Sequence, residues 1–125
     1  MKGIEILLLA AGGVIGTLVR YRITESQLVL GAFYANVLVV NVVGSFILGV
    51  FVVLSQQWNL DTKYALFVAV GFCGSLTTMS AFALQSTTMI DNKQFGLLAA
   101  NILANVGLSI GAIFAGRTLA ELVLR

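Results

Sequence analysis

The scarcity of charge constrains the fold of this chain more than any other feature. Seven Lys or Arg and five Asp or Glu residues are spread over 125 positions, and they leave charge-free stretches at 6–19, 26–60, 64–90 and 94–116. A soluble domain carries about a quarter charged residues, whereas an apolar run of about 20 residues can cross a bilayer as a helix. The chain is therefore expected to expose its outer surface to lipid.

We predict a single all-α membrane domain over residues 1–125 with transmembrane helices at about 3–22, 30–55, 63–89 and 94–121. The connections are short, so neighbouring helices should run antiparallel. The first apolar run superficially fits a signal peptide, but Arg20 and Arg22 stand where a small-residue cleavage site is expected. It is interpreted as a retained first helix of a multi-pass protein.

The basic residues give only a weak signal for orientation. With four spans, four of them fall on the side of the two termini and three on the other side. The first set is Lys2, Lys63, Arg117 and Arg125, and the second is Arg20, Arg22 and Lys93. Positive charge in short loops normally sets topology. The near-even split therefore predicts insertion both ways round, and with it a two-fold antiparallel dimer.

Small residues recur at helix-packing intervals. Gly12 and Gly16 form one G-x-x-x-G pair, and Gly107 and Gly111 form another. In lipid, such pairs let helix backbones approach closely. The spacing leaves open whether they pack within one subunit or between two. Because a four-helix chain of this size has little interior of its own, we favour an oligomer.

Polar residues interrupt two of the predicted helices at membrane depth. Asn41 lies among valines in the second helix, where an unpaired amide is costly. The third helix contains two glycines and several hydroxyl residues over 71–82, a pattern that indicates a helix break. The alternatives are an ordinary interhelical hydrogen bond for Asn41 and hydroxyl groups that bond back to their own helix in 71–82.

The fourth helix carries Asn101, Asn105 and Ser109 at a spacing of four, so they share one face. The chain has no His and a single Cys, Cys73, which is interpreted as a packing residue. No carboxylate lies near the middle of a predicted helix, which argues against proton-coupled transport. Enzyme chemistry and nucleic-acid binding have no support either. Neutral N–H and O–H donors at depth favour a passive anion path.

Three motifs together resemble the Fluc (CrcB-type) fluoride channel family of bacteria and archaea. They are the glycine-rich segment 12–21, the segment 38–46 around Asn41 that ends at Gly49, and the polar segment 71–82. Each motif is weak alone, but their order and spacing match the family over nearly the whole chain.

The resemblance implies an antiparallel dual-topology dimer with two fluoride pores in a prokaryotic plasma membrane. Its function would be passive export of cytoplasmic fluoride, and hence fluoride resistance. The resemblance implies a structural Na⁺ held by the backbone carbonyls of Gly74 and Thr77, and it places Arg20 in the vestibule. The residues that it assigns to the fluoride pore are Asn41, Thr78, Met79, Phe82 and Ser109.

The sequence also departs from the family. Met79 stands where a pore phenylalanine is usual, Gln85 where a glutamate is usual, and Ala83 where a serine is usual. Ile113 replaces a hydroxyl residue, and a usual Gly-Thr reads Asn36-Val37. The losses at Met79, Ala83 and Gln85 suggest one partner of a heterodimer with one degraded pore, and a homodimer that tolerates Met79 is the rival hypothesis.

Two other functions stay open at this point. A small four-helix multidrug-type transporter would need an acidic residue within the first helix, where Glu5 is too terminal. A non-conducting assembly subunit would not need the polar interruption of the third helix.

Overall fold

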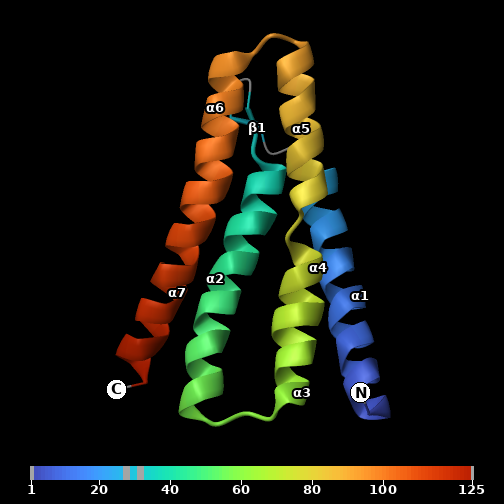
Figure 1. Ribbon diagram of the computed structural model, residues 1–125, viewed down its shortest axis with the longest axis vertical. Helices are drawn as coiled ribbons and strands as arrows, with labels where there is room; N and C mark the ends of the chain where they lie inside the picture. The colour runs from blue at the N-terminus through green and yellow to red at the C-terminus, as the bar shows by residue number, and fades with distance from the viewer. Residues whose placement is uncertain (1, 27–28, 31–32, 125) are drawn as a thin grey trace.

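The computed structural model describes residues 2–26, 29–30 and 33–124. Four helical segments in it are long and apolar enough to cross a membrane: Gly3–Glu25, Asn36–Gln57, Thr62–Asp91 and Phe95–Val123. They stand side by side as an elongated bundle (Figure 1). The prediction of four transmembrane helices from the charge-free stretches is confirmed.

The first two segments, α1 (Gly3–Glu25) and α2 (Asn36–Gln57), are joined by a small hairpin. Its strands, β1 (Val29–Leu30) and β2 (Phe33–Tyr34), pair antiparallel. The prediction that the second helix begins near residue 30 is therefore wrong, because the backbone there is engaged in strand pairing. Gly31 and Ala32, also inside that predicted helix, lie outside the described residues. At the start of α2, Asn36 Nδ2 donates to the Thr24 carbonyl at 2.9 Å and ties the helix to the end of α1.

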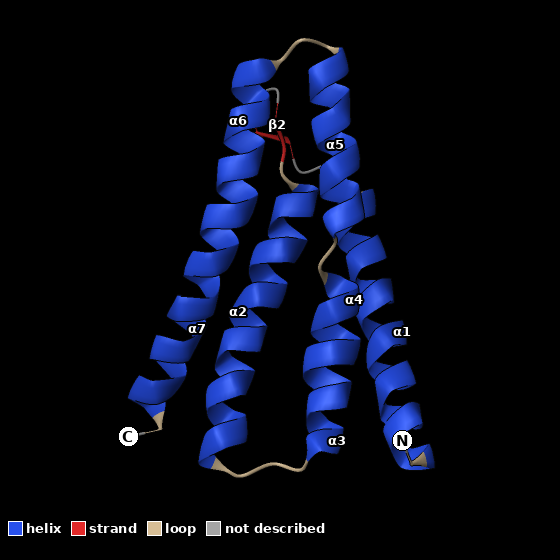
Figure 2. Ribbon diagram, in the orientation of Figure 1, coloured by secondary structure: helices blue, strands red, loops and turns tan. Residues whose placement is uncertain are grey.

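The third segment is interrupted near its middle. It runs as α3 (Thr62–Ala65), a π-helical stretch η1 (Leu66–Cys73), α4 (Gly74–Leu76) and α5 (Met79–Asp91). Thr77 (ψ 155°) and Thr78 (φ −150°, ψ 119°) adopt extended backbone between α4 and α5. Figure 2 shows this gap between the two helical parts. The predicted break in the third helix is confirmed.

The fourth segment comprises α6 (Phe95–Leu103), a π-helical stretch η2 (Ala104–Leu108) and α7 (Ser109–Val123). Both ends of the chain lie at one end of the bundle with the α2–α3 connection, and the α5–α6 connection lies at the other (Figure 1). Neighbouring segments therefore run antiparallel, as expected. Arg125, which was counted in the charge comparison, lies outside the described residues.

Glycines allow two close helix pairs. α1 packs against η1 and α4, where a Cβ on Gly12 or Gly16 would collide with the backbone of the third segment. α2 packs against α7, where a Cβ on Gly49 or Gly116 would collide with the backbone opposite. The first predicted G-x-x-x-G pair thus packs within one chain.

The second G-x-x-x-G pair behaves differently. A Cβ on Gly107 or Gly111 would meet nothing within 4 Å in the part of the chain that the structure describes. The spans are also poorly covered, since only 11–28% of their most apolar windows is buried within the chain. Most of the apolar surface therefore faces the surroundings, as it must in a multi-pass membrane protein.

Candidate functional site

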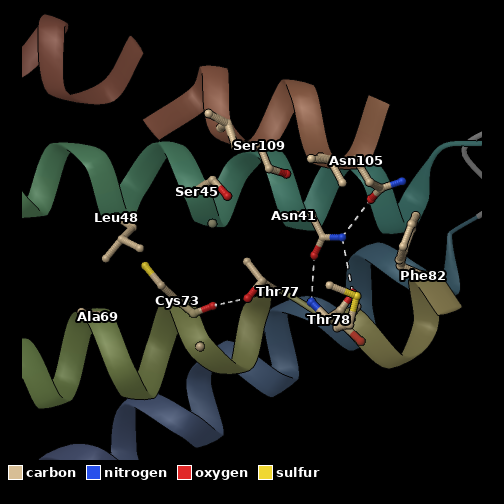
Figure 3. A pocket seen from close by; sticks show the side chains of 15 residues that line it. Asn41, Ser45, Leu48, Ala69, Cys73, Thr77, Thr78, Phe82, Asn105 and Ser109 are labelled. Carbon is tan, nitrogen blue, oxygen red and sulfur yellow. Dashed lines mark hydrogen bonds between the residues drawn. The ribbon is translucent and has the colours of Figure 1, made fainter. Parts of the chain in front are cut away.

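A cavity of about 390 Å³ opens beside the break in the third segment. It lies between the two close helix pairs, because α2, the third segment and the fourth segment all contribute to its wall (Figure 3). Its lining residues are Asn41, Gly44, Ser45, Leu48, Ala69, Cys73, Gly74, Thr77, Thr78, Met79, Phe82, Asn105, Val106, Ser109 and Ile110. The lining thus combines apolar and neutral polar side chains and contains no Asp, Glu, Lys or Arg.

The structure brings together seven of the eight residues that the sequence singled out. The five pore residues named above and the two carbonyl-bearing residues, Gly74 and Thr77, all line this cavity. Arg20 is placed elsewhere, on α1, where its Nε donates to the Ser75 carbonyl at 2.9 Å. Its guanidinium thus binds the end of α4, where a cation is favourable to the helix dipole. The assignment of Arg20 to a vestibule stays a prediction.

Asn41 binds both backbone groups of Thr78. The Thr78 N–H donates to Asn41 Oδ1 at 2.8 Å, and Asn41 Nδ2 approaches the Thr78 carbonyl at 3.4 Å. Asn41 Nδ2 also donates to Asn105 Oδ1 at 2.9 Å. Figure 3 shows these contacts, which converge on the break from α2 and the fourth segment. The amide thereby gives partners to backbone groups that a continuous helix would pair internally.

Two carbonyls at the break are deprived of the donors that a helix supplies. In an α-helix the Thr78 and Ala81 N–H groups would bond the carbonyls of Gly74 and Thr77. Here Thr78 N–H donates to Asn41, and Ala81 N–H donates to Thr78 Oγ1 at 3.2 Å. The Thr77 N–H makes the last ordinary helical bond, to the Cys73 carbonyl, and the Thr77 hydroxyl donates to the same carbonyl. The Gly74 and Thr77 carbonyls are hard oxygen donors of the kind that bind alkali and alkaline-earth cations, so these residues fit such an ion.

The polar face of the fourth segment forms a connected chain of amides. Asn105 Nδ2 donates to both the carbonyl and the Oδ1 of Asn101 at 2.9 Å. Asn101 Nδ2 in turn donates to Ser86 Oγ of α5 at 3.2 Å. Asn101 is fully buried and Asn105 is 5% exposed. Asn105 lies within η2, and competition of its side chain for the Asn101 carbonyl gives a physical reason for the wider helical turn there.

Ser109 follows on the same face, but its hydroxyl is left without a partner. Its Oγ is buried and has no hydrogen bond within the described part of the chain. Met79 differs again, because its side chain is 73% exposed at the edge of the cavity. Val106 and Ile110 of the lining are exposed as well, so the cavity combines one buried O–H donor that has no partner among the described residues with several exposed apolar side chains.

The polar stripe of Asn101, Asn105 and Ser109 is visible in the sequence, but only Ser109 of it was predicted to be a site residue. Asn105 is the functional candidate that was missed, and its spacing of four from both Asn101 and Ser109 was the available signal. Ser45 of α2 also lines the cavity, and nothing in its sequence context marks it.

Comparison with known proteins agrees with the motif resemblance. The family model described as "CrcB-like protein, Camphor Resistance (CrcB)" matches residues 7–117. A relative from Nitrosopumilus maritimus, named fluoride-specific ion channel FluC, is 60% identical over 124 residues, which cover 99% of this chain and 98% of that protein. Relatives of the same name from Methanococcus maripaludis and Methanocaldococcus jannaschii are 39% and 36% identical and cover 90% and 97% of this chain, or 93% and 98% of their own lengths.

The match extends over most of the chain, and the four spans, the broken third segment and the lined cavity are all present. The multi-pass protein described above is therefore a member of the CrcB-like protein family.

Proposed function

We propose that this chain is a subunit of a fluoride-specific ion channel that lets cytoplasmic fluoride leave the cell passively and so confers fluoride resistance. Relatives that match this chain over nearly their whole lengths are named fluoride-specific ion channels. The structural observation that carries the proposal is the buried Ser109 hydroxyl in the cavity beside the helix break, which has no hydrogen-bond partner among the described residues. A small anion that sheds water at this depth needs replacement donors, and a free O–H supplies one.

The remaining lining suits an anion that passes without being trapped. Phe82 presents a ring whose edge carries partial positive charge and can face an anion weakly. The lining holds no fixed charge, so binding stays weak enough for the ion to leave. Proton-coupled transport would need a titratable group at depth, whereas a passive path does not. The lining contains none of Asp, Glu, Lys or Arg, which agrees with a passive path.

We also propose that Na⁺ binds between the Gly74 and Thr77 carbonyls of two antiparallel copies. One chain offers two such carbonyls, and a two-fold axis would double the set. When bound, the ion would neutralise the carbonyl-rich end of α4, next to the carbonyl that Arg20 already binds. The exposed Gly107–Gly111 face and the poorly covered spans leave surface for both a second copy and lipid.

The chain carries two of its family departures side by side. Gln85 Nε2 approaches Asn36 Oδ1 at 3.5 Å, so these two unusual residues contact each other. The two replacements lie outside the cavity lining and match each other, which supports a chain that has adjusted to its departures and works as a homodimer. The heterodimer with a degraded pore remains the alternative, and it rests on the departures at Met79, Ala83 and Gln85.

The multidrug-transporter alternative gains no support from the site. Glu5 lies in the first turn of α1, where its Oε2 accepts a 3.3 Å hydrogen bond from the Lys2 backbone N–H. It is thus far from the cavity, which Glu5 does not line.

The test is fluoride efflux from liposomes that contain this chain alone, followed with a fluoride electrode. We expect efflux from the unsubstituted chain, a large loss in Ser109→Ala, and retention in Ser109→Thr, because threonine keeps the hydroxyl. Efflux only after addition of an unlike partner subunit would support the heterodimer. Full efflux from Ser109→Ala would remove the hydroxyl from the pathway.

A further inference from the structure

We propose that Asn41 and Asn105 form a clasp that holds the break in the third segment, and that they are positioning residues rather than ligands of the permeating ion. The proposal assigns roles within the cavity, so its consequence for transport rests on the proposed channel function. The clasp itself is a statement about hydrogen bonds and can be tested separately.

The first argument is that the Asn41 side chain supplies the hydrogen bonds that a continuous helix would give to the Thr78 backbone. A residue in extended backbone at mid-membrane has no neighbouring turn to pair its N–H and carbonyl groups. Asn41 supplies an acceptor at 2.8 Å and a donor at 3.4 Å to the same residue. Without it, the part-buried Thr78 N–H would lose its acceptor, and leaving such a group unpaired is unfavourable.

The second argument concerns the orientation of the two amides. A backbone N–H can only donate, so Thr78 fixes the oxygen of Asn41 toward the break. A backbone carbonyl can only accept, so Asn101 fixes the nitrogen of Asn105 away from Asn41. The remaining contact, from Asn41 Nδ2 to Asn105 Oδ1, then pairs a donor with an acceptor. Opposite backbone anchors thus lock both side chains in one arrangement.

The third argument is a count of the N–H donors of the two amides. Asn41 Nδ2 donates to the Thr78 carbonyl and to Asn105 Oδ1, and Asn105 Nδ2 donates to two oxygens of Asn101. Neither amide keeps an N–H for an anion within the described part of the chain. Ser109 differs from both because its buried hydroxyl has no partner there. The geometry therefore separates a donor for the ion from a clasp that shapes the cavity around it.

The clasp joins elements from all three walls of the cavity. Asn41 comes from α2, Thr78 from the break and Asn105 from η2. Through Thr78 it also keeps the neighbouring Thr77 backbone in place. A lost clasp should therefore loosen the break even when the cavity residues that face the ion are unchanged.

The experiment measures hydrogen exchange at the Thr78 amide in the full-length chain in lipid nanodiscs, together with fluoride efflux from liposomes. Asn41→Ala should accelerate exchange at Thr78 by about tenfold or more, because the acceptor is lost. Asn41→Asp keeps the acceptor for Thr78 N–H but cannot donate to Asn105, so it should accelerate exchange only severalfold, as Asn105→Ala should. Its efflux should fall, because it places a carboxylate in a neutral anion path. Asn105→Ala should accelerate exchange severalfold without touching Thr78 directly.

Ser109→Ala is the matched control from the same cavity. It should reduce efflux and leave exchange at Thr78 unchanged. Equal exchange in Asn105→Ala and the unsubstituted chain would overturn the clasp, and so would loss of protection in Asn41→Asp as complete as in Asn41→Ala. If the unsubstituted chain shows no efflux either alone or with an unlike partner subunit, the channel proposal fails while the exchange results still decide the clasp.

Discussion

The close contact between α2 and α7 predicts that the protein loses stability when one glycine at this contact is replaced by alanine. In Gly116→Ala the added Cβ would collide with the Phe46 carbonyl and approach Val50 N at 3.0 Å. Both obstacles are backbone atoms, so no side-chain rotation can relieve them, and the two helices must separate. Overpacking of this kind costs about 1–3 kcal/mol, and a backbone clash belongs at the upper end of that range.

The control is Gly96→Ala on the same transmembrane segment. A Cβ on Gly96 meets nothing within 4 Å among the described residues. Alanine should there stabilise the helix by up to about 1 kcal/mol through its higher helix propensity. The two substitutions are chemically identical, so their difference isolates the packing.

The assay is equilibrium unfolding of both variants in mixed detergent micelles, followed by circular dichroism. We expect Gly116→Ala to lower the free energy of unfolding by about 2–3 kcal/mol and Gly96→Ala to leave it equal or slightly raised. Equal stability of the two variants would refute the reasoning, because it would mean that α2 and α7 do not pack through glycine.

Three further predictions concern the cavity and the break. Met79→Phe should increase fluoride efflux severalfold, because it adds an electropositive ring edge to the lining; unchanged or lower efflux in a liposome assay would count against an aromatic contribution at this position. Arg20→Ala should lower the free energy of unfolding by about 1.5–3 kcal/mol through loss of the charged hydrogen bond to Ser75, and Arg20→Lys should recover only part of it; a stable Arg20→Ala variant in the same unfolding assay would show that this bond is dispensable. Conductance per channel should stay constant between about pH 6 and 7.5, because the chain has no His and the lining has no carboxylate; a titration step in single-channel recordings would reveal a group absent from this account.

The number and order of the transmembrane segments follow from charge alone, because each gap between charged clusters is long enough to cross a bilayer. The start of α2 was missed for a local reason. Residues 26–35 carry no charge, so hydropathy could not separate the β1–β2 hairpin from the helix that follows. Strand pairing over two residues per strand leaves almost no periodic signal in the sequence.

The break was predictable as a region but not as a residue. Gly71 and Gly74, which suggested it, both remain in helical conformation. The chain opens at Thr77 and Thr78 because Asn41, 37 residues earlier, offers partners to the Thr78 backbone. Such a tertiary contact cannot be deduced from local composition.

The cavity residues show the same division. Ser109 was selected, and its buried hydroxyl lines the cavity without a partner in the described part of the chain. Asn105 was passed over although it shares the same helix face. A spacing of four places side chains together, but it does not tell which amide is paired with a neighbouring helix. The glycine pairs could not be told apart from the sequence either. Gly12 packs against a neighbouring helix of the same chain, whereas Gly107 has no such neighbour among the described residues.

The central claim, that this chain forms a fluoride-selective path, is tested most directly by its reversal potential. The protein would be placed in a planar bilayer with fluoride salt on one side and chloride salt on the other. The account predicts a measurable current that reverses near the equilibrium potential of fluoride, with the current lost in Ser109→Ala. A current that reverses as expected for equal fluoride and chloride permeability, or no current at all, would contradict it.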